Sequence, residues 1–282
     1  MIKIVTDSTC YIPAEDLNKY DIRIASLQVI LNGQSYREVD LKNETFYDDM
    51  AKASEIPSSS QPSPEELYQT FEAIIKEGHS VLGIFLSSEM SGTYASAHAI
   101  KADLLEKYPN AQIKLIDSRT NCMQLGYICL VAAQAIAQGH DMATVITKAK
   151  DVIAHSRFIF TPDTLTYLKK GGRIGSASAL LGNLLQIKPI LTVNDGKTDV
   201  VTKVRTKKKA VDAIIDTFQK DLEVRHLGDV IVHHINCPEE GLALATKLES
   251  MLNRPVRIQS IGPVIGLHVG PGSIGIAYYT VQ

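Results

Sequence analysis

Hydroxyl-bearing residues gather at two points of the sequence where a loop meets a predicted helix. The loop Pro57–Ser63 combines four serines and a glutamine with two prolines, which restrict its backbone. The segment Ser87–Thr93 follows the apolar run Val81–Leu86 and opens a helix. A helix N-terminus offers unpaired N–H groups and a partial positive charge, to which Ser91 adds a hydroxyl and Gly92 allows close approach to the backbone. These residue types are suited to binding an anionic group.

Each of these features also has a simpler structural explanation, which the residues alone leave open. Ser91 is suited to capping the helix that follows it. Ser59 and Ser60 are typical of a polar surface turn as well as of a fixed set of hydrogen-bond donors. A third segment, Ile261–Gly272, places His268 among apolar residues and glycines. A buried histidine with a structural hydrogen bond is the alternative there.

The motifs of cofactor and metal sites are absent or stand in the wrong context. Gly270–Gly275 matches the dinucleotide fingerprint, but only seven residues follow it and they read as a strand, whereas the fingerprint needs a following helix. Gly171–Gly175 lacks the Lys-Ser/Thr ending of a phosphate-binding loop. His233 and His234 are adjacent on a predicted strand, so they face opposite sides and cannot share a metal. We therefore expect no cofactor, no bound metal and only reduced, structural cysteines.

Composition excludes several classes of protein. The 282 residues carry 29 Lys and Arg against 31 Asp and Glu, so there is no excess of positive charge for binding nucleic acid. The longest apolar candidate, Ile128–Ala137, is too short to span a bilayer, so we expect at most transient membrane contact. The first residues, Met1–Asp7, reach an acidic residue too early for an export signal. A cytoplasmic protein is expected.

The elements around these segments predict an α/β fold. Short, continuous apolar runs alternate with amphipathic segments in the first half, which indicates a mostly parallel sheet with crossover helices. An Asn32-Gly33 turn predicts a hairpin near residues 22–40. The predicted strands are Ile2–Val5, Val81–Leu86 and Ile113–Ile116, and the predicted helices are residues 64–77, Tyr94–Tyr108, Cys122–Ala137 and Met142–Ala154.

The second half of the chain predicts a mixed sheet. Asp195-Gly196 joins two strands as a second hairpin, so some of the pairing must be antiparallel. The predicted elements are the strands Ile187–Val193, Val200–Val204, Val230–His234, Val256–Gln259 and Ile274–Val281 and the helices Lys207–Leu222 and Glu239–Leu252. We therefore expect an N-terminal α/β domain at residues 1–156, a C-terminal mixed α/β domain at residues 157–282, and a ligand between them.

Taken together, the motifs resemble those of the bacterial DegV family. They occur in the order of that family across nearly the whole chain, and jointly they are specific. They are Thr6-Asp7-Ser8, Ser59-Ser60-Gln61-Pro62-Ser63, Ser91-Gly92-Thr93-Tyr94, Asp117-Ser118, Leu168-Lys169-Lys170-Gly171-Gly172-Arg173-Ile174, and Gly262-Pro263 with His268. The family usually has threonine where this chain has Ser59, which keeps the hydroxyl and loses a methyl group.

The resemblance implies two α/β domains that hold a long-chain fatty acid between them, as the acyl-carrying, non-enzymatic subunit of a fatty acid kinase. Ser59, Ser60, Ser91, Gly92 and His268 would hold the carboxylate, and the tail would fill an apolar tunnel. A separate ATP-binding kinase subunit would then make the acyl phosphate. We expect the hydroxyl and amide donors to be sufficient for the carboxylate without an arginine.

The basic residues of the Leu168–Ile174 motif are expected to contact the kinase partner and not the carboxylate. Arg173 and Lys170 are expected to contact the kinase or the acyl phosphate, whereas Lys207–Lys209 reads equally well as a solvated helix end. Two other functions stay open at this point. One is an enzyme that acts on a small phosphorylated or carboxylated metabolite at the Ser91 helix. The other is a regulatory module whose ligand changes its binding to a partner.

Overall fold

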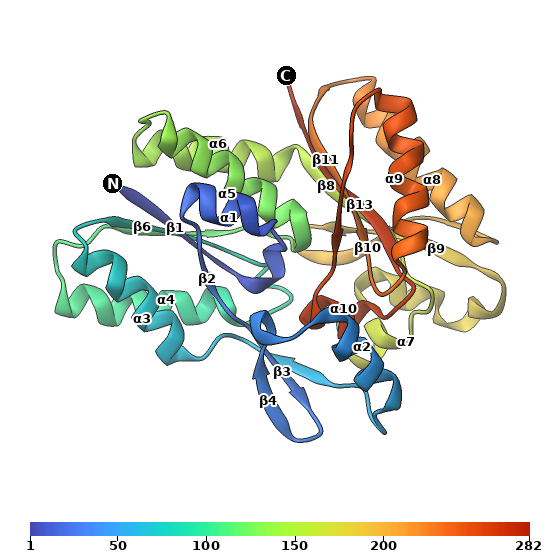
Figure 1. Ribbon diagram of the computed structural model, residues 1–282, viewed down its shortest axis with the longest axis horizontal. Helices are drawn as coiled ribbons and strands as arrows, with labels where there is room; N and C mark the ends of the chain where they lie inside the picture. The colour runs from blue at the N-terminus through green and yellow to red at the C-terminus, as the bar shows by residue number, and fades with distance from the viewer.

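A four-stranded parallel sheet forms the N-terminal part of the computed structural model (Figure 1). The backbone is described throughout residues 1–282, and side chains are described for all but residues 183–186. The strand order is β2-β1-β6-β7. The strands are β1 (Ile2–Asp7), β2 (Arg23–Ala25), β6 (Ser80–Phe85) and β7 (Ile113–Asp117). The predictions of β1, β6 and β7 are confirmed, and β2 is a short edge strand that the sequence did not reveal.

Helices cover both faces of this sheet, as a buried parallel sheet requires. The helices α3 (Pro64–Lys76) and α4 (Thr93–Lys107) lie on one face, and α1 (Ala14–Tyr20), α5 (Cys122–Ala137) and α6 (Met142–Ala154) lie on the other (Figure 1). Side-chain caps fix two of the starts. The Ser63 hydroxyl accepts the N–H of Glu66 at 3.1 Å, and Asp141 accepts that of Thr144 at 2.9 Å. The helices predicted from these signals are confirmed.

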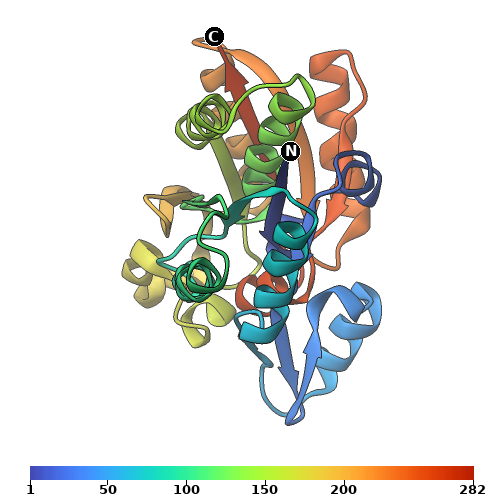
Figure 2. The same cartoon turned by 90° about the vertical axis from the view of Figure 1, so that its left-hand side faces the viewer.

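A separate three-stranded antiparallel sheet, with the order β4-β3-β5, projects at one end of the molecule (Figure 2). It consists of β3 (Gln28–Leu31), β4 (Gln34–Arg37) and β5 (Ser58–Ser60). Asn32 and Gly33 both have positive φ angles, 52° and 77°, so the predicted hairpin turn is confirmed. The serine loop is a correction, because Ser58–Ser60 is a strand that pairs with β3.

The C-terminal part is built on a six-stranded mixed sheet with the order β10-β9-β8-β13-β11-β12. Only the β11–β12 pair is parallel within it. Its strands are β8 (Ser156–Thr161), β9 (Lys188–Asn194), β10 (Lys197–Val204), β11 (His226–His234), β12 (Arg257–Ser260) and β13 (Ile274–Val281). The predicted mixed sheet and its β9–β10 hairpin are confirmed.

The two faces of the six-stranded sheet pack against different parts of the chain. The helices α8 (Lys207–Leu222) and α9 (Pro238–Leu252) cover the outer face, where Tyr278 packs on Phe218 (Figure 1). Ala277, the neighbour of Tyr278 on β13, faces the opposite way into the larger core. The inner face contacts α5, which also touches β1 and β6. One helix therefore joins the two large sheets, and the expected division at residue 156 stays a prediction.

Short helices complete the structure. They are the α-helices α2 (Asn43–Lys52), α7 (Thr166–Lys170) and α10 (Pro263–Val269), and the 3-10 helices η1 (Ser8–Cys10), η2 (Glu38–Asp40) and η3 (Gly175–Gln186). The helix α10 contacts α2, β3 and β5, so it links the small sheet to the C-terminal part. Across the described residues, no helix has the length and apolar character to cross a bilayer.

Candidate functional site

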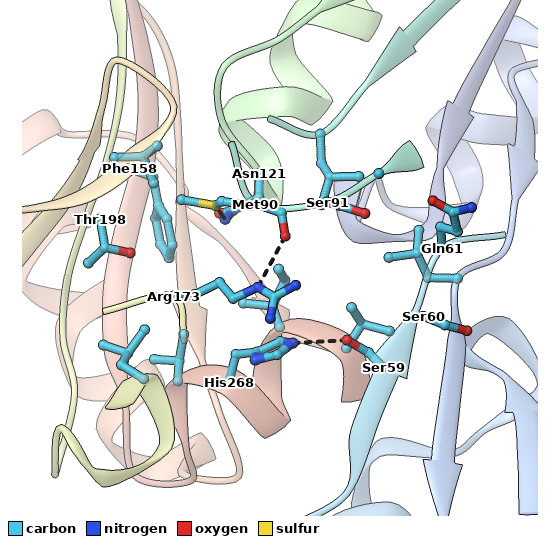
Figure 3. Close-up of a pocket in the computed structure, with 18 of the residues that line it drawn as sticks. Ser59, Ser60, Gln61, Met90, Ser91, Asn121, Phe158, Arg173, Thr198 and His268 are labelled. Atoms are coloured by element: carbon cyan, nitrogen blue, oxygen red, sulfur yellow. Dashed lines mark hydrogen bonds between the residues drawn. The ribbon is translucent and has the colours of Figure 1, made fainter. Parts of the chain in front are cut away.

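A pocket lies where the carboxyl ends of the parallel strands meet β5, α10 and the inner face of the six-stranded sheet (Figure 3). It holds about 750 Å³ of empty space, part of which is open to solvent. Apolar side chains form much of its wall, among them Leu27, Leu86, Phe158, Phe160, Leu168 and Val193. Polar residues line the rest, among them Ser59, Gln61, Ser91, Gly92, Asn121, Arg173 and His268. Such a mixture suits a ligand with one polar and one apolar end.

Ser59 and His268, which are 209 residues apart in the sequence, are hydrogen-bonded in this pocket. The distance from Ser59 Oγ to His268 Nε2 is 2.9 Å (Figure 3). Strand β5 supplies the serine and helix α10 supplies the histidine. Ser60 also borders the pocket, but its exposed hydroxyl points away from this pair, because successive side chains of a strand face opposite sides.

His268 is held as a neutral ring. Burial, and to a smaller extent the Arg173 guanidinium, lowers the pKa of His268 to about 4. Its Nδ1 atom is buried and has no hydrogen-bond partner among the described residues. When Nε2 carries the ring proton and donates it to Ser59 Oγ, the Ser59 hydroxyl proton is free to donate to a ligand oxygen. The pair can therefore present one directed O–H donor to the pocket.

Ser91 and Gly92 lie in the loop between β6 and α4. Gly92 is the N-cap residue of α4, and the Ser91 hydroxyl accepts the Thr93 N–H at 3.3 Å and pairs with the Thr93 hydroxyl at 2.9 Å. Ser91 thus takes part in the helix start and also lines the pocket. A Cβ atom at residue 92 would collide with the Gln61 amide oxygen, so glycine permits the loop and the β5 end to approach closely.

Arg173 lies in the pocket wall, which differs from the expectation of a site without arginine. Its Nε donates to the Met90 carbonyl oxygen at 3.1 Å and its Nη1 donates to that of Gly171 at 2.6 Å. Figure 3 shows the guanidinium beside the His268 ring. A fixed positive charge therefore stands next to the hydroxyl donors. Lys170, by contrast, is exposed on α7 and is not among the residues that line the pocket.

Two buried carboxyl groups position the segments that carry these donors. Asp7 accepts the N–H of Leu86 at 2.7 Å, which holds the loop that leads to Ser91. Glu38 accepts the N–H of Val264 at 2.8 Å, which holds α10 and its histidine. Burial raises the pKa of Asp7 to about 6 and that of Glu38 to about 7. Asp7 stands in a motif quoted from the sequence, but nothing there indicated its role, and Glu38 carried no signal.

The structure shows where the Gly270–Gly275 and His233 motifs lie. Gly270–Gly275 connects α10 to strand β13, so the helix that pyrophosphate binding needs does not follow. His233 is fully buried, and its Nδ1 pairs with the Gln259 carbonyl oxygen at 2.8 Å. Among the described side chains, no group of three His, Cys, Asp or Glu could hold a metal ion.

Comparisons with known proteins agree on one family. The family model described as "Uncharacterised protein, DegV family" matches residues 1–281. A DegV domain-containing protein of Clostridium acetobutylicum is 48% identical over 279 residues, covering 99% of this chain and 98% of the relative. Protein DegV of Bacillus subtilis is 34% identical over 282 residues, covering 98% of each.

Solved structures show the same fold. A stearic acid-binding protein of Eubacterium ventriosum superposes with a TM-score of 0.92 at 29% identity, covering 99% of this chain and 98% of the other. The structure of DegV, a fatty acid binding protein from Bacillus subtilis, gives a TM-score of 0.88 at 33% identity, covering 99% of each chain. Sequence and fold lead to the same conclusion, that this chain belongs to the DegV family.

Proposed function

We propose that this protein binds a long-chain fatty acid and presents its carboxylate to a separate ATP-binding kinase subunit. The observation that carries the proposal is the Ser59–His268 hydrogen bond at the polar end of a pocket whose remaining wall is largely apolar. Solved relatives described as fatty acid binding, from Bacillus subtilis and Eubacterium ventriosum among others, support the ligand class.

The two ends of the ligand would contribute in different ways. Burying about 15 methylene groups at about 0.8 kcal/mol each gives a gross gain on the order of 12 kcal/mol, which exceeds common ordering costs. The carboxylate would accept the Ser59 and Ser91 hydroxyls, with Gly92 allowing close approach and Arg173 supplying positive charge. We expect affinity to come mainly from the tail, and orientation from the head group.

The kinase step would use the carboxylate as the nucleophile. One carboxylate oxygen would attack the γ-phosphorus of ATP on the partner, forming the acyl phosphate and releasing ADP. Hydroxyl donors neutralise the carboxylate only partly, so an oxygen lone pair would stay available for the attack. Arg173 lines the pocket and is exposed to solvent, a position from which it could contact both the head group and the incoming phosphate.

Native mass spectrometry of the protein as purified tests the ligand class. We expect a bound acid of roughly 14 to 18 carbons, because shorter chains bury too little apolar area. After delipidation, the Ser59→Ala variant should bind palmitate and oleate more weakly. Ser58→Ala is the matched control, since Ser58 is exposed on the same strand and is not among the residues lining the pocket. If the delipidated wild-type protein binds neither acid at saturation, the proposal is wrong.

Acyl-phosphate formation with a separately purified fatty acid kinase subunit tests the partner role. Product should require both proteins and ATP. The Arg173→Ala variant should reduce turnover, whereas Lys208→Ala removes an exposed positive charge on α8 and should not. Unchanged lipid affinity and unchanged turnover in Arg173→Ala would remove this residue from the proposal. Turnover by the wild-type protein without the kinase would instead favour an enzyme.

A further inference from the structure

Asn121 is a buried polar residue in the pocket wall whose amide is scarcely used by the protein. It is 6% exposed and precedes helix α5. Its Oδ1 atom has no hydrogen-bond partner among the described residues. Its Nδ2 atom donates only to the sulfur of Met90, at 3.2 Å, and a thioether is a weak acceptor. A thioether sulfur can only accept, so the contacts favour the orientation in which Nδ2 faces Met90 and Oδ1 is the unpaired atom.

The usual structural use of an asparagine at this position is taken over by another side chain. Asn121 is the N-cap residue of α5, where its side chain would ordinarily accept an N–H of the first turn. Here the Met123 N–H donates instead to Nε2 of His233, at 3.1 Å. Burial lowers the pKa of His233 to about 4, so this ring is neutral and can accept. The Asn121 amide is consequently left to face the pocket.

An unpaired amide in the pocket wall has a free-energy cost, which a ligand that hydrogen-bonds to it could remove. A buried acceptor without a partner costs about 1–3 kcal/mol. Apolar side chains, including Leu86 and Phe158, line the same pocket. Met90 connects the amide to the head-group end, since its carbonyl oxygen accepts from Arg173 while its sulfur accepts from Asn121. Asn121 therefore lines the same pocket as the polar donors and the apolar side chains, and Figure 3 shows it next to Met90.

We propose that Asn121 forms a polar subsite that selects fatty acids carrying a hydroxyl group on the chain, an inference that rests on the proposed function. An acceptor needs a donor, so a hydroxyl satisfies Oδ1 whereas a double bond or a keto group does not. An unsubstituted chain would cover the amide and leave it unpaired. Sites that hydrogen-bond a substrate hydroxyl discriminate against the analogue that lacks it, because their polar group then stays unsatisfied.

Competition binding to the delipidated full-length protein tests this inference. The ligands are stearate and the 3-, 10- and 12-hydroxystearates, which place the hydroxyl at different distances from the head group. The wild-type protein should bind at least one isomer more tightly than stearate. Asn121→Leu keeps the side-chain size and removes the amide. This variant should bind the preferred hydroxystearate about tenfold more weakly than the wild type, because one hydrogen bond is lost, so the preference disappears. It should bind stearate at least as tightly as the wild type.

The controls separate this inference from the proposed function. Ser58→Ala should leave the ratio of affinities unchanged, and circular dichroism should check that each variant folds. If Asn121→Leu does not fold, Asn121→Ala removes the same amide. No preference for any isomer in the wild type, or equal ratios in wild type and variant, would overturn the subsite while stearate binding upholds the proposed function. Failure of the wild type to bind stearate and every hydroxystearate would overturn both.

Discussion

The buried carboxyl group of Glu38 provides a sharp test of how the site is held together. Glu38 is 4% exposed, and it accepts hydrogen bonds from the Val264 N–H at 2.8 Å, from the Tyr11 hydroxyl at 2.9 Å and from the Ser8 hydroxyl. Val264 lies in the first turn of α10, which carries His268. No Lys or Arg is among its described hydrogen-bond partners, so the ionised carboxylate depends on neutral donors alone.

The effect of this burial on stability follows from proton linkage. Burial raises the pKa of Glu38 from 4.5 to about 7 in the folded protein. Between these values the folded state binds more protons than the unfolded state, so the free energy of unfolding falls as the pH rises. The full difference corresponds to about 3 kcal/mol, most of which develops between pH 5 and pH 8.

Other buried groups titrate in the same range and must be separated from Glu38. Burial raises the pKa of Asp7 to about 6, which also makes stability fall as pH rises towards that value. Burial lowers the pKa of His233 and of His268 to about 4. The folded state then binds fewer protons between about pH 4 and 6.5, so these two groups make stability rise with pH. The useful quantity is therefore the difference between a variant and the wild type.

The Glu38→Gln variant removes the titration and keeps an amide oxygen that can accept the Val264 N–H. We expect the free energy of unfolding of the variant, relative to wild type, to increase by about 2 to 3 kcal/mol from pH 5 to pH 8. Urea unfolding at several pH values, followed by circular dichroism, measures it. Glu44→Gln, an exposed position on α2, should show a constant difference. A constant difference for Glu38→Gln as well would refute the linkage argument.

Two further variants probe the surroundings of the pocket. A Cβ atom at residue 171 would collide with Nδ1 of His268, so Gly171→Ala should displace the histidine ring. We expect fatty acid binding to weaken about tenfold in a direct titration. Unchanged affinity would contradict the role of the Ser59–His268 pair. Arg119 forms an ion pair with Asp195 in the β9–β10 turn, with 2.7 Å between Nη2 and Oδ1, but the Asp195 side chain is 90% exposed. Asp195→Asn removes the charge and tolerates the positive φ of 45° at this turn position. It should therefore change the free energy of unfolding by less than about 1 kcal/mol in urea titrations, and a larger loss would contradict the expectation for an exposed ion pair.

Much of the fold could be predicted because its signals are local. The cap and proline at Ser63-Pro64 indicated the start of α3, and Gly139 indicated the end of α5. The β5 strand could not be found in this way. Its serines have low strand propensity, and Ser59 is in the sheet because Val29, thirty residues earlier, pairs with it. Such pairing depends on contacts that no local window contains.

The same distinction applies to the site. The family resemblance grouped Ser59, Ser91 and His268 as carboxylate ligands, and all three line one pocket, while their role as ligands stays a prediction. Arg173 was assigned to the kinase or the acyl phosphate, and its place in the pocket wall could not be predicted because its bond to the Met90 carbonyl oxygen joins residues 83 positions apart. Asn121 was missed for a related reason, since only the bond between Met123 and His233 reveals that its amide is not a cap.

A crystal structure of the delipidated protein saturated with palmitate tests the central claim most directly. We predict a carboxylate oxygen within about 3 Å of Ser59 Oγ, a second contact to the Ser91 hydroxyl, and an acyl chain that runs towards Phe158. A carboxylate bound elsewhere, a chain in the opposite direction, or a pocket without lipid at saturation would contradict the account.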